Sequence, residues 1–454
     1  MSTGRERDSI PAFTKLCKEF KKNNQISPQL YEKFQVKRGL RNSDGSGVMA
    51  GLTLICNVHG YIIDDGELIP REGKLYYRGI EVSEIVENCL REGRFGFEET
   101  IWLLLFGTLP REEDLSAFRD LLSVWRELPD YFAEDMIIKA PSPNIMNKLA
   151  RSVLALYSYD DAPDDTHIEN VMRQSISLIA QLPTIMCYAY QVKRRHYDNQ
   201  SMFLHPMTKG HSTAEFILSS IRADRSFTKE EAQILDMCLI LHAEHGGGNN
   251  STFTSRVLSS SGTDTYSAIA GAIGALKGPR HGGANIKVMK QLEAVKSNVS
   301  NVSDDDEILE FLKKIIRREE GDGSGLVYGM GHAVYTLSDP RAVILKRNAK
   351  KLAEERGLAD DFALLEAIER LTPEAFRQVK GVGKMMCANV DLYSGLVYKS
   401  LGISEDLFTP LFAVSRVAGW CAHRIEEITS GGKIIRPAYK AVLKNRSYLP
   451  LKDR

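Results

Sequence analysis

Segments with helical signals follow one another from Ile80 onward, and this run constrains the fold more than any other feature of the sequence. Proline and glycine punctuate it, and Pro183 is expected to begin one of the helices because proline is favoured at the first helical position. Thr228 and Glu231 form a capping-box pattern ahead of the apolar segment AQILDMCLILHAEH. The sequence therefore predicts a mainly α, multi-helical fold.

Strand signals are confined to one short region near the N-terminus. Apolar and polar residues alternate over residues 52–59, which predicts a strand, and LYYRG (Leu75–Gly79) is a candidate partner strand. Before it, an apolar stripe predicts a helical arm within residues 10–45, starting at Pro11. The expected architecture is therefore helical, with minor β structure near the N-terminus.

The bulk composition excludes several classes of function. The chain has 454 residues with 59 basic and 59 acidic side chains, so its net charge is zero and no basic field marks a nucleic-acid or membrane partner. The seven cysteines are scattered and form no C-x-x-C. The sequence also shows no apolar run of bilayer-spanning length and no N-terminal signal pattern. We therefore expect a cytoplasmic protein. An anionic ligand would have to be held by a few placed arginines.

Three of the ten histidines, His242, His245 and His281, lie beside glycines at predicted helix ends. Such a cluster is typical of a binding or catalytic site, although histidine also complements the dipole at helix C-termini. His242 and His245 are spaced to bind a metal, but a third ligand and the H-E-x-x-H pattern are missing. The favoured reading is no metal, with His245 contacting an anion and His242 serving structure.

The remaining candidates carry alternatives when each is judged alone. His281 lies in a glycine turn before a helix, where backbone N–H groups disfavour the imidazolium, so it is either a neutral donor for an enolate or a turn histidine. His332 follows two glycines in GMGH, within a loop that is either a hinge or part of a site. Asp391 begins a helix, as either a cap or a base. Arg416 lies in an apolar helix, where a buried guanidinium needs an anion.

Taken together, and in this order along the chain, the motifs resemble those of the citrate synthase family. The segments that carry the resemblance are LYYRG, FEETIWLLLFG, LHAEHGGGNNSTFTSRV, GALKGPRHGGAN, GMGHAVYTLSDPRA, NVDLYSG and SRVAGW followed by RP. The resemblance spans nearly the whole chain from about Gly47. It implies a large helical domain of residues 1–282 and 397–454 and a smaller mobile helical domain of residues 283–396.

The same resemblance implies an acyltransferase of the tricarboxylic acid cycle. Such an enzyme condenses acetyl-CoA with oxaloacetate to citryl-CoA and hydrolyses the thioester to citrate and CoA. Acetyl-CoA is a substrate, and no metal or other cofactor is implied. The family forms homodimers or dimer-based oligomers with a shared active site, and allosteric control is left open.

Seven residues of this chain match functional positions of the family. They are Asp391 as the base that deprotonates the acetyl methyl group, His281 as the neutral donor to the thioester oxygen, His332 as the group that polarises the oxaloacetate carbonyl, His245 as a substrate-binding residue, and Arg341, Arg416 and Arg436 as carboxylate ligands. The resemblance places Arg436 in the site of the neighbouring subunit. Arg280 and Thr336 depart from the common pattern, at positions that bear on coenzyme A contacts.

Three alternatives remain beside this interpretation. A 2-methylcitrate synthase using propionyl-CoA would share the catalytic set, because the acyl group differs by one methylene, worth about 1–3 kcal/mol. A metal-dependent hydrolase would use His242, His245 and a carboxylate. A helical binding protein would keep the fold without catalysis.

Overall fold

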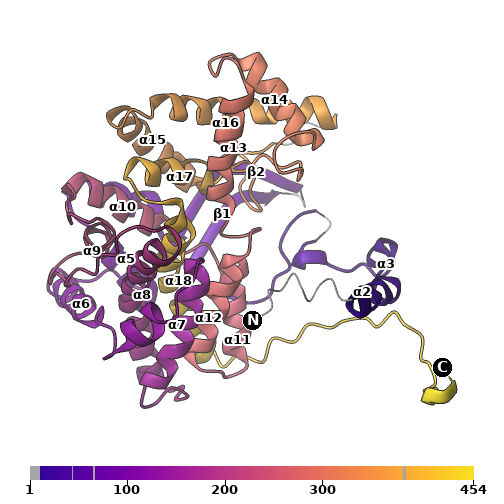
Figure 1. Ribbon diagram of the computed structural model, residues 1–454, viewed down its shortest axis with the longest axis horizontal. Helices are drawn as coiled ribbons and strands as arrows, with labels where there is room; N and C mark the ends of the chain where they lie inside the picture. The colour runs from indigo at the N-terminus through magenta and orange to yellow at the C-terminus, as the bar shows by residue number, and fades with distance from the viewer. Residues whose placement is uncertain (1–10, 43, 65–66, 382–384, 454) are drawn as a thin grey trace. The chain divides into compact units, whose positions relative to one another are not determined.

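The computed structural model describes the chain except for residues 1–10, 43, 65–66, 382–384 and 454. The chain forms two compact units, Met1–Gly51 and Leu52–Arg454 (Figure 1). The first unit contains α2 (Pro11–Asn23), α3 (Pro28–Lys33) and the short η1 (Arg38–Leu40). The predicted helical arm is therefore confirmed within its described residues.

The second unit is built almost entirely of helices, which confirms the mainly α prediction. Its α-helices are α4 (Val82–Glu92), α5 (Phe97–Phe106), α6 (Glu112–Trp125), α7 (Ile145–Leu156), α8 (Ile168–Tyr197), α9 (Thr213–Ile221), α10 (Lys229–His242), α11 (Asn250–Ser260), α12 (Thr265–Lys277), α13 (Ala284–Asn298), α14 (Asp305–Arg317), α15 (Pro340–Glu355), α16 (Ala359–Lys380), α17 (Val390–Ser400) and α18 (Phe408–Thr429). Shorter helical turns are η2 (Ala133–Ile138), η3 (Tyr157–Tyr159), η4 (Glu405–Leu407) and η5 (Leu451–Asp453).

The sheet consists of β1 (Cys56–Asp64), β2 (Glu67–Tyr77) and the short β3 (Ile80–Glu81), in the antiparallel order β1-β2-β3. Cys56 is paired with Tyr77, so the expected pairing with the LYYRG segment is confirmed. The predicted start of the strand is wrong by four residues. Leu52 and Leu54 are exposed and precede the ladder, because β2 ends at Tyr77 and offers them no partner.

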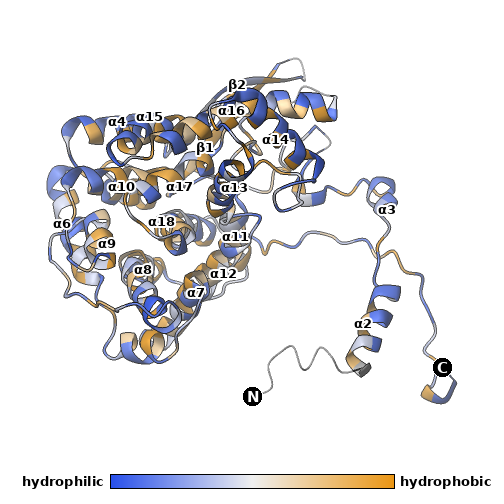
Figure 2. Cartoon of the chain, turned by 45° about the horizontal axis from the view of Figure 1, so that its top comes forward, coloured by the Kyte–Doolittle hydropathy of each residue, from blue (hydrophilic) through white to orange (hydrophobic). Residues whose placement is uncertain are grey.

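Helix α18 forms the centre of the second unit. It packs against α5, α8, α10, α11 and α12, and every residue from Phe408 to Arg424 is buried. A helix that is buried on all sides belongs inside a bundle, and Figure 2 shows α18 in the interior with other helices around it. The small-residue helix α12 contacts α7, α11 and α18.

Helix α8 runs without a break through Pro183, so the prediction that a helix begins there is wrong. A proline inside a helix costs about 3 kcal/mol because it removes one hydrogen bond and crowds the preceding turn. The residues on both sides of Pro183, from Leu178 to Val192, are mostly buried. We infer that this burial outweighs the local cost.

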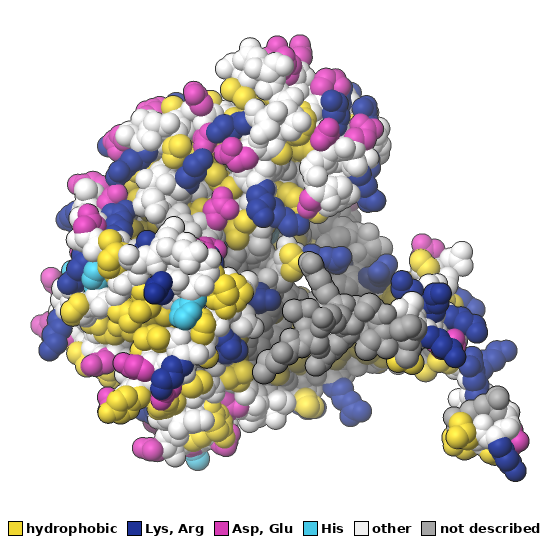
Figure 3. Space-filling model, in the orientation of Figure 1, with side chains coloured by type: hydrophobic (Ala, Val, Ile, Leu, Met, Phe, Trp, Pro, Cys, Tyr) yellow, Lys and Arg dark blue, Asp and Glu magenta, His cyan; other side chains and the backbone are white. Residues whose placement is uncertain are grey.

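Helices α13 to α17 lie together at the top of Figure 1, beyond the ends of β1 and β2. Most of these residues fall in the predicted small domain, but residues 52–454 form one compact unit, and the division into two domains stays a prediction. Basic and acidic side chains are interspersed on the face shown in Figure 3. No described helix is long and apolar enough to span a bilayer.

Candidate active site

The C-terminal end of α10 carries His242 into the core. The predicted capping box is present at the other end of this helix: Thr228 Oγ1 accepts from the Glu231 N–H at 3.2 Å, and the Glu231 carboxylate accepts from the Thr228 N–H at 3.0 Å. His242 Nδ1–H donates to the carbonyl oxygen of Cys238 at 2.8 Å. Burial lowers the pKa of His242 to about 3, so the ring is neutral, and its bonding supports a structural role.

His245 lies beyond the end of α10, at a glycine turn. Gly246 has φ +84°, and a Cβ there would lie 3.2 Å from Val58 of β1, so the turn brings the chain close to the sheet. His245 is buried, and its Nε2 has no hydrogen-bond partner among the described residues. Burial, followed by the charges of Arg341, His332 and Arg416, holds its pKa well below the usual value. His245 is therefore a neutral ring with an unused polar atom.

His332 is packed against His245. Their ring centroids are 5.0 Å apart, and Tyr335 stacks on His332 with centroids separated by 4.6 Å. His332 Nδ1 accepts the backbone N–H groups of Val334 at 3.0 Å and Tyr335 at 3.1 Å. Because Nδ1 accepts, the ring proton is on Nε2. This tautomer is the one that a donor to a substrate carbonyl through Nε2 requires.

The glycine loop around His332 is bonded to the segment that leads into α17. The Gly331 N–H donates to the Cys387 carbonyl at 2.8 Å, and the Asn389 N–H donates to the Gly329 carbonyl at 2.9 Å. Gly329 has φ +83°, and a Cβ there would come within 3.0 Å of the Leu392 backbone. Glycine is required here, since it allows the loop to lie directly on the first turn of α17.

Asp391 is in that first turn. Asn389 is the N-cap, and its side chain accepts from the Asp391 N–H at 3.0 Å, so the Asp391 carboxylate is not needed as a cap. The Asp391 side chain is half-buried. Burial raises its pKa to about 6, although the charges of Arg341 and Arg416 oppose the shift. At neutral pH it is a carboxylate with more basicity than an ordinary aspartate.

Two buried arginines bring positive charge to the same place. Arg341 donates from Nε and Nη2 to Asp339, at 3.0 and 2.7 Å, which compensates its charge within one turn of α15. Arg416 lies in α18 and is fully buried; its Nε donates to the His242 carbonyl at 2.7 Å. Both Nη atoms of Arg416 lack a hydrogen-bond partner in the described structure. A pair of buried guanidinium donors without hydrogen-bond acceptors is a site prepared for a carboxylate.

His281 lies in the loop between α12 and α13. Its Nε2 is hydrogen-bonded to Ser251 Oγ at 3.0 Å, and that oxygen also accepts from Trp420 Nε1–H at 3.1 Å. Burial, with a smaller contribution from Arg416, lowers its pKa to about 4. The ring is neutral above that pH, as the sequence predicts, and Nδ1 is the nitrogen not bonded to Ser251.

Six of the seven predicted residues are linked by pairwise interactions, most of them with Arg416 or Arg341, although they come from distant parts of the chain. These are His245, His281, His332, Arg341, Asp391 and Arg416. Arg436 is the exception, since it is exposed in the irregular segment after α18. In the part of the chain that is described, no three His, Cys, Asp or Glu side chains are grouped so as to hold a metal.

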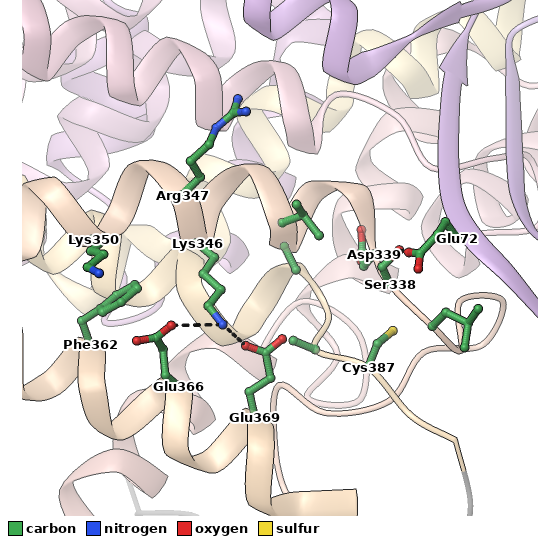
Figure 4. A pocket seen from close by; sticks show the side chains of 14 residues that line it. Glu72, Ser338, Asp339, Lys346, Arg347, Lys350, Phe362, Glu366, Glu369 and Cys387 are labelled. Carbon is green, nitrogen blue, oxygen red and sulfur yellow. Dashed lines mark hydrogen bonds and ion pairs between the residues drawn. The ribbon is translucent and has the colours of Figure 1, made fainter. Parts of the chain in front are cut away.

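Two hollows bear on the location of the site. The one in Figure 4, about 560 Å³, lies beside α15, and its Lys346 is paired with Glu366 at 3.2 Å and Glu369 at 2.8 Å. None of the seven predicted residues lines it. A second hollow of about 540 Å³ is lined by His281 together with Arg280. The second hollow is therefore the better candidate for substrate entry.

Sequence reasoning missed several buried partners of these residues. Tyr335 holds His332 through stacking and a backbone bond, and Asp339 neutralises Arg341. Glu244 is fully buried against His423 of α18. Their pairing joins residues 179 apart in the sequence, so no local pattern could have revealed it.

Comparisons with known proteins show which family the chain resembles. Residues 44–438 match the family described as citrate synthase, C-terminal domain. A citrate synthase from Synechocystis sp. is 33% identical over 84% of this chain and 89% of its own length. A 2-methylcitrate synthase from Corynebacterium glutamicum is 32% identical over 92% of this chain and 99% of its own length.

A solved structure is also similar. It is the ternary complex of carboxymethyl coenzyme A and oxaloacetate with the citrate synthase from Thermoplasma acidophilum, with a TM-score of 0.74 and 26% identity over 92% of this chain and 99% of that chain. The order of motifs, the helical fold and the match over most of the sequence lead to one conclusion. The chain belongs to the citrate synthase family.

Proposed function

We propose that the protein is a citrate synthase, an acyltransferase that condenses acetyl-CoA with oxaloacetate and water to give citrate and CoA. The observation that carries the proposal is the buried guanidinium of Arg416, whose two Nη atoms have no partner within the described residues. They lie near two neutral histidines and a carboxylate of raised pKa. A dicarboxylate substrate would supply the missing acceptors.

Following the family resemblance, we assign a part of the reaction to each group. Asp391 removes a proton from the methyl carbon of acetyl-CoA while His281 donates a hydrogen bond to the thioester oxygen, so a hydrogen-bonded enolate forms rather than a free carbanion. The enolate carbon attacks the ketone carbon of oxaloacetate, a carbon–carbon bond forms, and the ketone oxygen takes the proton of His332 Nε2–H to become the hydroxyl of citryl-CoA. Water then cleaves the thioester of citryl-CoA, which releases citrate and the CoA thiol.

The magnitudes suit this chemistry. A positioned acid or base contributes about 10²–10⁴-fold, and one preorganised oxyanion donor about 10²–10³-fold. The pKa of about 6 makes Asp391 a stronger base than an ordinary aspartate while it stays ionised at neutral pH. His281 and His245 are neutral there, so neither places a cation beside the base and lowers its basicity.

The test is an assay of free thiol released from acetyl-CoA. We expect release to require oxaloacetate and to proceed without added metal. Thiol release independent of oxaloacetate, or none at all, would refute the proposal. A protein of this fold that only binds its ligands gives the second result.

The second candidate is a 2-methylcitrate synthase, favoured by the similarity to the Corynebacterium glutamicum enzyme over nearly its whole length. The two activities share every group above and differ in the space allowed for one methylene. Comparing kcat/KM for acetyl-CoA and propionyl-CoA decides between them. A higher value for propionyl-CoA would replace our first candidate by this one.

We also propose that the protein is a dimer, or an assembly of dimers, in which Arg436 completes the site of the partner. This rests on the family resemblance and is supported by the exposed position of Arg436 in the irregular segment after α18. A location in the cytoplasm is proposed as well, and it is supported by the seven cysteines, none of which is in a disulfide.

A further inference from the structure

One face of α18 presents Arg416, Gly419 and His423, which are spaced so that each lies one turn from the next. A Cβ at Gly419 would overlap the Glu244 Oε2 atom and the Ala243 carbonyl oxygen. The Glu244 carboxylate therefore lies directly on the glycine, between the arginine one turn before it and the histidine one turn after it. Glycine is what allows an ionisable side chain to approach the helix so closely.

His423 is held in one tautomer. Arg256 of α11 donates to its Nδ1 from Nε at 3.0 Å and from Nη2 at 2.7 Å. A guanidinium carries only donors, so Nδ1 must accept, and the ring proton is on Nε2. Nε2–H then donates to Glu244 Oε1 at 3.0 Å. Both His423 and Glu244 are fully buried.

The charge of Arg256 is balanced at its outer side. Its Nη1 donates to Glu427 Oε2 at 2.7 Å, and its Nη2 donates to Glu426. Glu426 also accepts from the Leu54 N–H at 2.7 Å, close to the start of β1. Arg256 therefore does not draw on Glu244 for its counter-charge, and the remaining cation beside Glu244 is Arg416.

Glu244 has an acceptor atom, and Arg416 has donor atoms, that lack a hydrogen-bond partner in the described structure. The Oε2 atom of Glu244 and both Nη atoms of Arg416 have no hydrogen-bond partner among the residues described. Burial would raise the pKa of Glu244, but His423 and Arg416 outweigh burial and keep the pKa below its usual value. A buried charge without compensation is strongly unfavourable, so each group stabilises the ionised form of the other.

We propose that Glu244 is a positioning residue for Arg416. Arg256 fixes the tautomer of His423, and His423 in turn holds the Glu244 carboxylate. This fixed carboxylate keeps Arg416 charged and in place while the substrate position is empty. The Nη atoms thus stay directed at the site instead of turning toward another acceptor. The inference rests on the proposed function, in which Arg416 binds a carboxylate of oxaloacetate.

Glu244→Gln keeps the size of the side chain and removes its charge. We expect KM for oxaloacetate to rise at least about tenfold, while KM for acetyl-CoA changes by less than about twofold and kcat falls by less than about threefold. Glu244→Asp keeps the charge and should recover part of the loss. A role in stability alone would not separate the two substrates in this way.

The histidine gives a second and independent test. A glutamine at position 423 can accept from Arg256 through its oxygen and donate to Glu244 through its amide, whereas leucine can do neither. His423→Gln should therefore keep KM for oxaloacetate within about threefold, and His423→Leu should raise it as Glu244→Gln does. Equal effects of the two substitutions on this KM would refute the role of His423 in holding Glu244.

Glu98→Gln is the matched control. Glu98 of α5 is also buried, with one oxygen bonded to the Thr213 N–H at 2.7 Å and the other without a partner in the described chain. It should leave KM for oxaloacetate unchanged, even if the melting temperature falls. If KM for oxaloacetate is unchanged or lowered in Glu244→Gln, the proposal is refuted. If it is unchanged or lowered in Arg416→Ala, the binding role of Arg416 is refuted.

Discussion

Replacing Asp391 by asparagine is expected to abolish turnover and to stabilise the fold at neutral pH. The carboxylate has a pKa of about 6 because burial disfavours its charge, against 3.8 for the ordinary side chain. A group whose pKa is raised by folding contributes stability that is fully present below the unfolded value and is lost as the pH rises through the folded value. Above pH 6 the ionised aspartate therefore opposes folding.

The difference of about two pKa units corresponds to about 3 kcal/mol, and partial exposure of the side chain reduces this to about 1–3 kcal/mol. Asparagine avoids this cost because it is uncharged at every pH. We expect Asp391→Asn to raise the free energy of unfolding by that amount at pH 7.5. The gain should shrink between pH 6 and pH 4 and vanish below.

The measurement is urea unfolding of the two proteins at pH 7.5 and pH 4, at equal protein concentration, together with thiol release at pH 7.5. Turnover should fall by about 10²–10⁴-fold, the usual contribution of a positioned base. A gain in stability that is the same at both pH values would refute the electrostatic reasoning. Turnover close to that of the wild type would show that Asp391 is not the base.

Three further outcomes are expected. In the unmodified enzyme, kcat/KM for acetyl-CoA should fall about tenfold per pH unit below about pH 6, because protonated Asp391 cannot accept the methyl proton; a profile flat down to pH 5 would contradict this. Inactive Arg341→Ala and Arg436→Ala proteins, unfolded together and refolded, should regain thiol release if the site is shared between subunits, and no recovery would refute that arrangement. Arg280→Ala should raise KM for acetyl-CoA several-fold but not for an acetyl thioester that lacks the CoA phosphates, because the exposed guanidinium lines the hollow beside His281; equal effects would exclude a phosphate contact.

Much of the fold could be predicted because its signals are local. The capping box at Thr228 and Glu231, the aspartate cap at Asp339 and the continuous apolar face of α18 act within one helix, and the structure contains all of them. The helix start predicted at Pro183 is wrong because the neighbours of this proline are buried, and burial is decided by segments that lie far away in the sequence. The predicted start of β1 is wrong for a similar reason, since strand pairing depends on where β2 ends.

For the candidate site, the sequence allowed the main residues to be selected but not the side chains that hold them. Glycines beside His281 and His332 mark tight turns, and Arg416 among valines marks a buried charge, so these residues could be selected from the sequence. Their partners could not. Trp420 and Ser251, which hold His281, are not adjacent in sequence to each other or to it, and their contact exists only after folding.

Backbone and side-chain hydrogen bonds tie the glycine loop that carries His332 to the start of α17, which carries Asp391, so the two segments are expected to move together. Met330 bridges Ala388, and the Asn389 side-chain amide donates to the Gly331 carbonyl at 2.9 Å. Asp391, the proposed base, and His332, the proposed donor to the ketone oxygen, thus lie on two segments that are bonded to each other. A movement of the bonded pair shifts both side chains together and keeps the distance between them.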